Sequence, residues 1–172
     1  MILFEELAHE VVALASKKKV WISVAESLTG GLVAATLVSV PGASAVFSGG
    51  VVAYNLQVKR SLLGVDPDVL NAHGAVHPEV ARQMARGVRY ACAVANDEGA
   101  VAHADIGIST TGVAGPDPDP LTRQPAGTVW IGLSSSKGEV AKALELRGSR
   151  SEIRKQTVEA VLDLLKNELE SL

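Results

Sequence analysis

A chain of 172 residues suits one domain built around a single hydrophobic core, and we predict one domain over residues 1–172. Apolar residues make up 47% of the chain and charged residues 20%, which is the balance of a folded globular protein. The net charge of −3 offers no general attraction to polyanions, so nucleic-acid binding is disfavoured. The single cysteine, Cys92, excludes a disulfide framework and a cluster of thiolate metal ligands.

Residues 1–19 read MILFEELAHEVVALASKKK and carry three glutamates where a signal peptide requires an unbroken apolar run. No apolar stretch in the sequence approaches the length that spans a bilayer. We therefore expect a cytoplasmic protein without membrane contact.

The first third of the chain alternates between helical and strand patterns. Apolar residues between Phe4 and Ala15 recur at helical spacing and predict an opening helix that ends at the lysine run 17–19. Residues 20–24 then read as a short buried strand. Residues 28–38 are apolar and rich in alanine, which predicts a second helix closed by Pro41 and Gly42.

The middle of the chain continues this alternation. Residues 46–54 are rich in valine and predict a strand, and residues 59–70 predict short helices around a turn at Asp66 and Pro67. A further helix begins at His77 and Pro78, because proline fits the first helical turn.

The last third predicts a buried strand over residues 106–110 and two more over residues 128–134 and 140–146. The link between the last two is short enough for an antiparallel hairpin. A final helix begins near Ser151. We therefore predict an α/β fold, a three-layer α/β/α domain with a mixed, mostly parallel sheet and a late antiparallel hairpin.

Residues 115–127 hold four of the seven prolines. Because proline cannot donate to a strand ladder, this segment predicts a stiff extended loop. It is either a lid over a site or an ordinary connection, and the sequence alone favours neither.

The candidate site lies in the segment AESLTGG at residues 25–31, between a predicted strand and a predicted helix. Open α/β sheets place their sites at such junctions, and free N–H groups at a helix start can hold an anion or an oxyanion. Taken alone, a helix cap formed by Ser27 or Thr29 is the simpler interpretation.

Standard nucleophile and phosphate-loop motifs are absent from the sequence, and no histidine is well placed to activate a serine. His73 and His77 lie four positions apart, but Gly74 and Pro78 disfavour one continuous helix there, so no metal site is expected. A lysine can act as the base if burial keeps it neutral. Lys59 follows an apolar strand and is the best candidate, although by itself a surface position beside Arg60 is the simpler interpretation.

Taken together, these residues resemble the CinA carboxy-terminal-domain family, whose characterised members are nicotinamide-nucleotide amidases. The similarity covers nearly the whole chain, and AESLTGG and TGVAGP in this order are its most specific parts. The matching segments are AESLTGG (25–31), PGAS (41–44), F-x-x-G-x-V-x-Y (47–54), LLGV (62–65), HGAV (73–76), TGVAGP (111–116), PAGTVWIGL (125–133) and R-G-x-R-x-x-I-R (147–154).

The resemblance implies hydrolysis of the carboxamide of nicotinamide mononucleotide (NMN) to nicotinic acid mononucleotide and ammonia. It implies Ser27 as nucleophile, Lys59 as base and Tyr54 as a proton relay or an orienting group for the lysine. The implied substrate-binding residues are Thr29, Gly30, Gly31, Thr111, Gly112, Arg150 and Arg154. Backbone N–H groups of residues 29–31 would bind the oxyanion, and Arg150 or Arg154 would bind the phosphate.

This chemistry requires neither a metal nor an organic cofactor, and the resemblance favours a homo-oligomer. Two alternatives remain open at the level of the sequence. One is a serine amidohydrolase that acts on another small amide, and the other is a non-catalytic nucleotide-binding or protein-interaction module.

Overall fold

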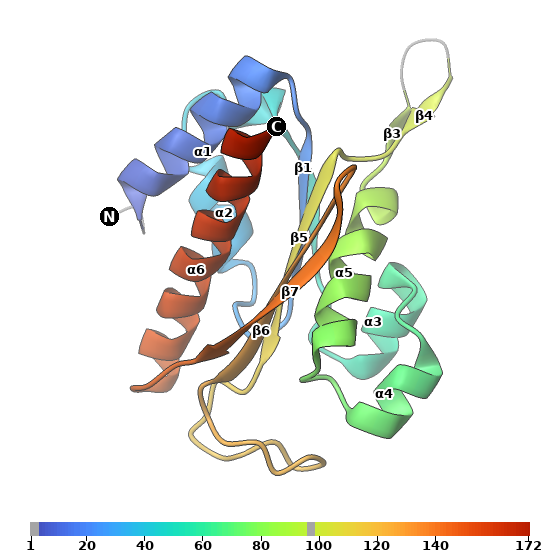
Figure 1. Cartoon of the computed structure of the whole chain (residues 1–172), viewed down its shortest axis with the longest axis vertical. Coiled ribbons are helices and arrows are strands. Elements are labelled where there is room, and N and C mark those ends of the chain that lie inside the picture. Colours follow the sequence, from blue (N-terminus) through green and yellow to red (C-terminus); the bar gives the residue numbers. More distant parts are fainter. Residues whose placement is uncertain (1–3, 96–98) are drawn as a thin grey trace.

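The structure, a computed structural model, describes residues 4–95 and 99–172 (Figure 1). A five-stranded sheet with the order β2-β1-β5-β6-β7 forms its centre. The strands are β1 (Ile22–Glu26), β2 (Phe47–Val52), β5 (Ile106–Gly112), β6 (Thr128–Ser135) and β7 (Gly138–Glu145). A separate antiparallel pair is formed by β3 (Val94–Ala95) and β4 (Val101–Ala102).

Helices cover both faces of the sheet, which gives the three layers seen in Figure 1. One face carries α1 (Glu5–Lys18), α2 (Leu32–Val38) and α6 (Arg150–Ser171), and the other carries α3 (Leu56–Leu63), α4 (Pro67–His73) and α5 (Pro78–Ala91). Each face has its own cluster of buried apolar side chains, because each helix layer buries one apolar stripe against the sheet. The predicted α/β/α architecture is confirmed.

The sheet is mixed, as predicted. Strand β1 lies parallel to both of its neighbours, β2 and β5, whereas β6 lies antiparallel to β5 and β7. Four strands therefore run in one direction and β6 runs against them. The predicted late hairpin is the pair β6 and β7.

The second helix begins later than predicted. It starts at Leu32 rather than at residue 28, because Gly30 and Gly31 have φ values of 61° and 98°. A right-handed helix excludes such left-handed conformations, which glycine adopts at no steric cost. Residues 27–31 form a turn instead, and this turn presents Ser27 at the end of β1. The pair β3 and β4 was not predicted, because two-residue strands carry no hydrophobic periodicity.

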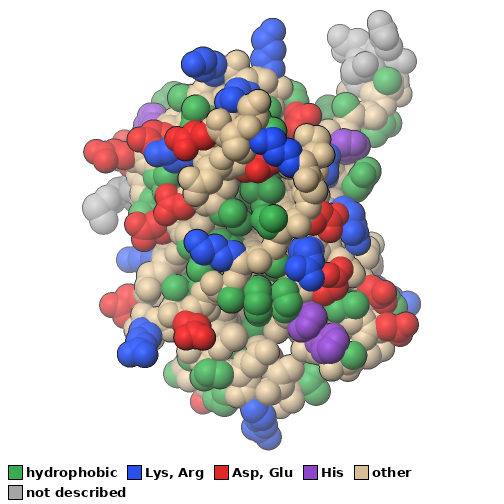
Figure 2. Space-filling view, viewed as in Figure 1, with side chains coloured by type: hydrophobic (Ala, Val, Ile, Leu, Met, Phe, Trp, Pro, Cys, Tyr) green, Lys and Arg blue, Asp and Glu red, His purple; other side chains and the backbone are tan. Residues whose placement is uncertain are grey.

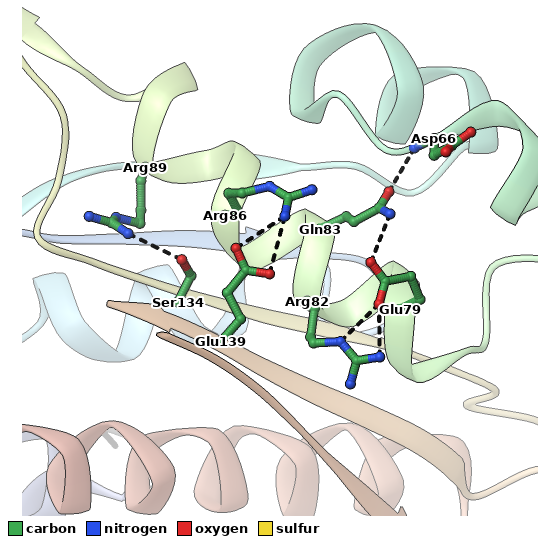
Figure 3. Close-up of polar contacts among 8 residues, drawn as sticks. All are labelled: Asp66, Glu79, Arg82, Gln83, Arg86, Arg89, Ser134 and Glu139. Carbon is green, nitrogen blue, oxygen red and sulfur yellow. Dashed lines mark hydrogen bonds and ion pairs between the residues drawn. The ribbon is translucent and has the colours of Figure 1, made fainter. Parts of the chain in front are cut away.

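Polar contacts along α5 help to fix its neighbours (Figure 3). The Gln83 side chain accepts from the Asp66 N–H at the start of α4 (2.7 Å) and donates to Glu79 (2.9 Å). Arg86 pairs with Glu139 of β7 at 3.1 Å (Figure 3). These contacts connect α5 to the sheet edge on one side and to the α3–α4 connection on the other.

Helix α3 lies unusually close to α5 at one glycine. A Cβ atom added to Gly87 would lie 1.8 Å from the carbonyl oxygen of Leu63, far below contact distance. Only a residue without a side chain therefore allows α3 to approach α5 as it does. Gly87 therefore sets how closely α3 can pack against α5.

Figure 2 shows acidic and basic side chains interspersed over the visible face, in keeping with a net charge of −3. Within residues 4–95 and 99–172, no helix has the length and apolar character needed to cross a bilayer.

Candidate active site

Ser27 is the first residue after β1, at the carboxyl end of that strand. Its N–H donates to the Thr110 carbonyl at 3.0 Å, which continues the pairing of β1 with β5. Its side chain is buried, with only 7% of the residue exposed. In the sheet register Glu26 pairs with Val52 at the end of β2 and with Thr110 near the end of β5, so the carboxyl ends of three parallel strands lie beside this serine.

The side chain of Glu26, the last residue of β1, lies at the N-terminus of α2. Its carboxylate accepts hydrogen bonds from the N–H groups of Gly31 (2.9 Å), Val33 (3.1 Å) and Ala34 (2.8 Å). The helix cap is therefore this glutamate, and the interpretation of Ser27 or Thr29 as the cap is wrong. A carboxylate also complements the positive end of the helix dipole.

The N–H groups expected to bind an oxyanion are partly engaged already. Gly31 donates to Glu26, and Gly30 donates to the Ser27 carbonyl at 3.2 Å. Two N–H groups next to the serine, those of Leu28 and Thr29, have no acceptor among the described residues. These two are the available main-chain donors, and the sequence reasoning missed Leu28.

Lys59 lies on α3 and is fully buried, so its interpretation as a surface residue is wrong. Its Nζ donates to Ser27 Oγ at 2.9 Å, to the Ala53 carbonyl through a short contact, and to the Tyr54 carbonyl at 3.5 Å. Desolvation by burial lowers the pKa of Lys59 from 10.5 to about 8. The structure thus brings together the serine and lysine that the sequence predicted to act as a pair.

The three oxygen atoms around Nζ suit a neutral amine. A neutral lysine has two N–H bonds, which match the two carbonyls, and one lone pair, which can accept the hydroxyl proton of Ser27. The arrangement therefore supplies an acceptor for the serine proton through the amine itself.

Local sequence explains why α3 directs a lysine inward. Asn55 begins the helix, since its side chain accepts from the Gln57 N–H at 2.8 Å. Lys59 and Leu63 are the two buried residues of α3 and lie four positions apart, on one face of the helix. The Lys59 stem thus follows the same path into the interior as an ordinary core residue.

Tyr54 contributes its main chain rather than its hydroxyl to this cluster. Its carbonyl lies 3.5 Å from Lys59 Nζ, whereas its hydroxyl accepts from Arg150 Nη2 at 3.1 Å. The side chain is 63% exposed. In this geometry Tyr54 orients the lysine through its carbonyl, and its hydroxyl is held at Arg150.

The two predicted arginines are placed differently. Arg150 is exposed and also donates to the Gly115 carbonyl at 2.8 Å, at the start of the proline-rich loop. Arg154 is partly buried and donates to the carbonyls of Leu28 (2.9 Å) and Thr29 (2.7 Å). Arg150 therefore remains open to a ligand, while Arg154 holds the serine turn.

Thr111 and Gly112 have contacts within the protein. The Thr111 hydroxyl donates to the Ala75 carbonyl at 2.7 Å, and a Cβ on Gly112 would lie 2.7 Å from the Thr128 carbonyl oxygen. Thr110, which the sequence reasoning missed, shares a 2.8 Å hydroxyl contact with Thr29. The signal for Thr110 was a run of hydroxyl residues in an otherwise apolar strand.

Across residues 4–95 and 99–172, no group of three or more histidine, cysteine, aspartate or glutamate side chains is arranged to hold a metal ion.

Comparison with known proteins identifies relatives over nearly the whole chain. A CinA-like protein of Frankia casuarinae is 42% identical over 168 residues, which cover 98% of this chain and 36% of that protein. The chain spans about a third of the length of such curated relatives.

Two solved structures share the fold. The competence/damage inducible protein CihA from Agrobacterium tumefaciens has a TM-score of 0.85 and 33% identity, over 96% of this chain and 94% of that one. A CinA superfamily protein from Klebsiella pneumoniae has a TM-score of 0.87 and 27% identity, over 98% of both chains. A family model described as the CinA C-terminal domain matches residues 4–169, and this chain belongs to that family.

Proposed function

We propose that this protein hydrolyses the carboxamide of NMN to nicotinic acid mononucleotide and ammonia, with Ser27 and Lys59 as a catalytic dyad. The observation that carries the proposal is the 2.9 Å contact between Lys59 Nζ and Ser27 Oγ, made by a fully buried lysine. The resemblance to a family of nicotinamide-nucleotide amidases supplies the substrate.

In the first half of the reaction, neutral Lys59 takes the proton of Ser27 while Oγ attacks the amide carbon. The carbonyl oxygen becomes an oxyanion, and the N–H groups of Leu28 and Thr29 are the donors available to it. One such donor is worth about 3 kcal/mol of transition-state stabilisation. Protonated Lys59 then gives its proton to the amide nitrogen, the carbon–nitrogen bond breaks, and ammonia leaves behind an acyl-enzyme.

In the second half, Lys59 is neutral again and takes a proton from water. The resulting hydroxide attacks the ester carbon, and a second tetrahedral intermediate forms. Its collapse breaks the bond between the carbon and Ser27 Oγ, and Lys59 returns the proton to the serine. Nicotinic acid mononucleotide leaves, and the dyad is regenerated.

Arg150 is the candidate for the substrate phosphate. Its guanidinium group is exposed next to Tyr54, which directly follows the Ala53 carbonyl bound by Lys59. Arginine binds phosphate oxygens through paired N–H donors. Phosphate binding would draw Arg150 away from Tyr54 or add to that contact.

The test is ammonia release from NMN by the wild type and by the variants Ser27→Ala and Lys59→Met. We expect each substitution to lower kcat by about 10⁴-fold or more, because the dyad acts as a unit. Two exposed residues provide matched controls, Ser61→Ala on the same helix and Lys142→Met on β7, and both should retain full activity.

Full activity in either dyad variant would remove that residue from the mechanism. A wild type that releases no ammonia from NMN but whose Ser27 is labelled by acylating probes would indicate a different small amide as substrate. Binding of NMN with neither turnover nor labelling would indicate a non-catalytic nucleotide-binding module.

A further inference from the structure

Arg154 on α6 holds the turn that follows the nucleophile. Its Nε donates to the Leu28 carbonyl at 2.9 Å and its Nη2 donates to the Thr29 carbonyl at 2.7 Å. These residues lie more than 120 positions apart in the sequence, so the contact is tertiary rather than local. Two donors on one planar group fix both carbonyl directions at once.

Fixing a carbonyl also fixes the N–H group of the same peptide unit. Peptide planes are rigid, and in a trans peptide the C=O and N–H bonds point in opposite directions. The only cis peptide bond among the described residues joins Gly115 and Pro116, so the Leu28–Thr29 bond is trans. Because the Arg154 guanidinium binds the Leu28 oxygen, the Thr29 N–H points away from that guanidinium.

The neighbouring donor is fixed in the same way. The Gly30 N–H donates to the Ser27 carbonyl at 3.2 Å, which sets the Ser27–Leu28 peptide and hence the direction of the Leu28 N–H. The N–H groups of Leu28 and Thr29, which have no acceptor in the described part of the chain, are thus each held in direction by a hydrogen bond to the carbonyl of the same peptide unit.

We propose that Arg154 is a positioning residue that aligns and polarises the Leu28–Thr29 peptide as an oxyanion donor for acyl transfer at Ser27. The inference rests on the proposed function for the identity of the substrate, and it replaces a phosphate-binding role for this arginine. Arg154 acts through the main chain and touches neither the substrate nor the reacting atoms.

The charge of Arg154 adds to its geometric effect. A cation on the carbonyl oxygen withdraws electron density from the peptide, which makes the N–H of that peptide a stronger donor. The effect is largest when negative charge develops on the substrate oxygen, so it stabilises the transition state more than the bound substrate. Loss of Arg154 should therefore lower kcat and leave KM nearly unchanged.

The experiment compares Arg154→Gln and Arg154→Lys with the control Lys155→Gln, which removes a charge from the next, exposed residue. Turnover is measured with NMN and with nicotinamide riboside, which lacks the phosphate. We expect Arg154→Gln to lower kcat for both substrates by about 10- to 100-fold, with KM changed by less than about threefold. Arg154→Lys should retain part of the lost rate, and the control should match the wild type.

A second measurement does not depend on NMN as the substrate. With p-nitrophenyl acetate, Ser27 Oγ bonds to the acetyl carbon, p-nitrophenolate leaves, and Lys59 takes the serine proton. We expect Arg154→Gln to slow this acylation by a similar factor, and added guanidinium ion to restore part of the rate in Arg154→Ala. Thermal unfolding of each variant identifies any general loss of the fold.

The outcomes separate the two proposals. If the wild type releases no ammonia from NMN, the proposed function fails, and the acylation rate still decides the role of Arg154. An unchanged acylation rate in folded Arg154→Gln would overturn the inference. A loss confined to KM for NMN, with none for the riboside, would instead assign Arg154 to the phosphate.

Discussion

Burial of an ionisable amine links folding and chemistry at a single residue. Desolvation lowers the pKa of Lys59 from 10.5 to about 8, so below pH 8 the folded protein must hold a buried ammonium. Between pH 8 and 10.5 the unfolded chain binds the additional proton. The free energy of unfolding therefore rises with pH across this window, and the cost of the buried charge is fully present below it.

Replacing Lys59 with methionine removes that cost and keeps an unbranched apolar stem. A pKa lowered from 10.5 to about 8 corresponds to about 3 kcal/mol at pH 7, which the lost hydrogen bonds partly offset. We expect Lys59→Met to raise the free energy of unfolding at pH 7 by about 1 to 3 kcal/mol in urea titrations. This increase in the free energy of unfolding should become smaller towards pH 10. The exposed control Lys142→Met should show no such increase. A less stable variant at pH 7 would contradict this account.

The same titration should govern the rate. Because only neutral Lys59 can accept the serine proton, kcat/KM for NMN should rise with pH, with a midpoint near the pKa of about 8, and level off above it. The measurement is the pH profile of ammonia release between pH 6 and pH 10, within the range where the fold is retained. A flat profile through pH 8 would exclude Lys59 as the base.

At the scale of elements, the turn after β1 depends on the cap supplied by Glu26. Its carboxylate is buried and accepts three N–H groups of α2. Glu26→Ala would leave these donors without a partner, and we expect a loss of about 2 to 4 kcal/mol in the free energy of unfolding together with a lower kcat.

Urea unfolding and NMN turnover test this expectation on the same samples. The control is Glu159→Ala, which removes an exposed carboxylate from α6. Wild-type stability in Glu26→Ala would show that water or a rearranged turn replaces the cap.

Helix α3 shows how packing away from the site bears on the distance between the two proposed catalytic groups. The helix carries Lys59 inward, while Gly87 on α5 allows the Leu63 carbonyl of α3 to approach closely. Neither the Lys59 amine nor the Ser27 hydroxyl takes part in the contact between Leu63 and Gly87. The amine proposed as the base is therefore placed by the packing of α3 against α5 together with its own hydrogen bonds to Ser27 Oγ and two carbonyls.

At the scale of the whole molecule, the layers and most elements could be predicted from the sequence. Apolar periodicity follows directly from which face of an element is buried, so the long helices and central strands were recognisable. The start of α2 was misplaced because Leu28 extends the largely apolar pattern of residues 32–38, whereas the backbone at the intervening Gly30 and Gly31 is left-handed. The spacing of hydrophobic residues does not report where the backbone becomes left-handed.

The site was only partly predictable for a related reason. Ser27 and Lys59 were paired through family resemblance, since local pattern does not encode a contact between residues 32 positions apart. The roles of Glu26 and Arg154 depend on which main-chain atoms the fold places beside them, and the sequence indicated neither. A homo-oligomer also remains a prediction from resemblance.

The arrangement of three oxygen atoms around Lys59 Nζ has one further consequence. As an ammonium, the lysine has three hydrogens for Ser27 Oγ and the carbonyls of Ala53 and Tyr54; as an amine, it keeps two and turns its lone pair to the serine. The same scaffold thus accommodates both charge states without any heavy atom having to move. Successive proton transfers in a turnover would incur little reorganisation, which is the condition under which a weakly basic amine can act repeatedly in a dry interior.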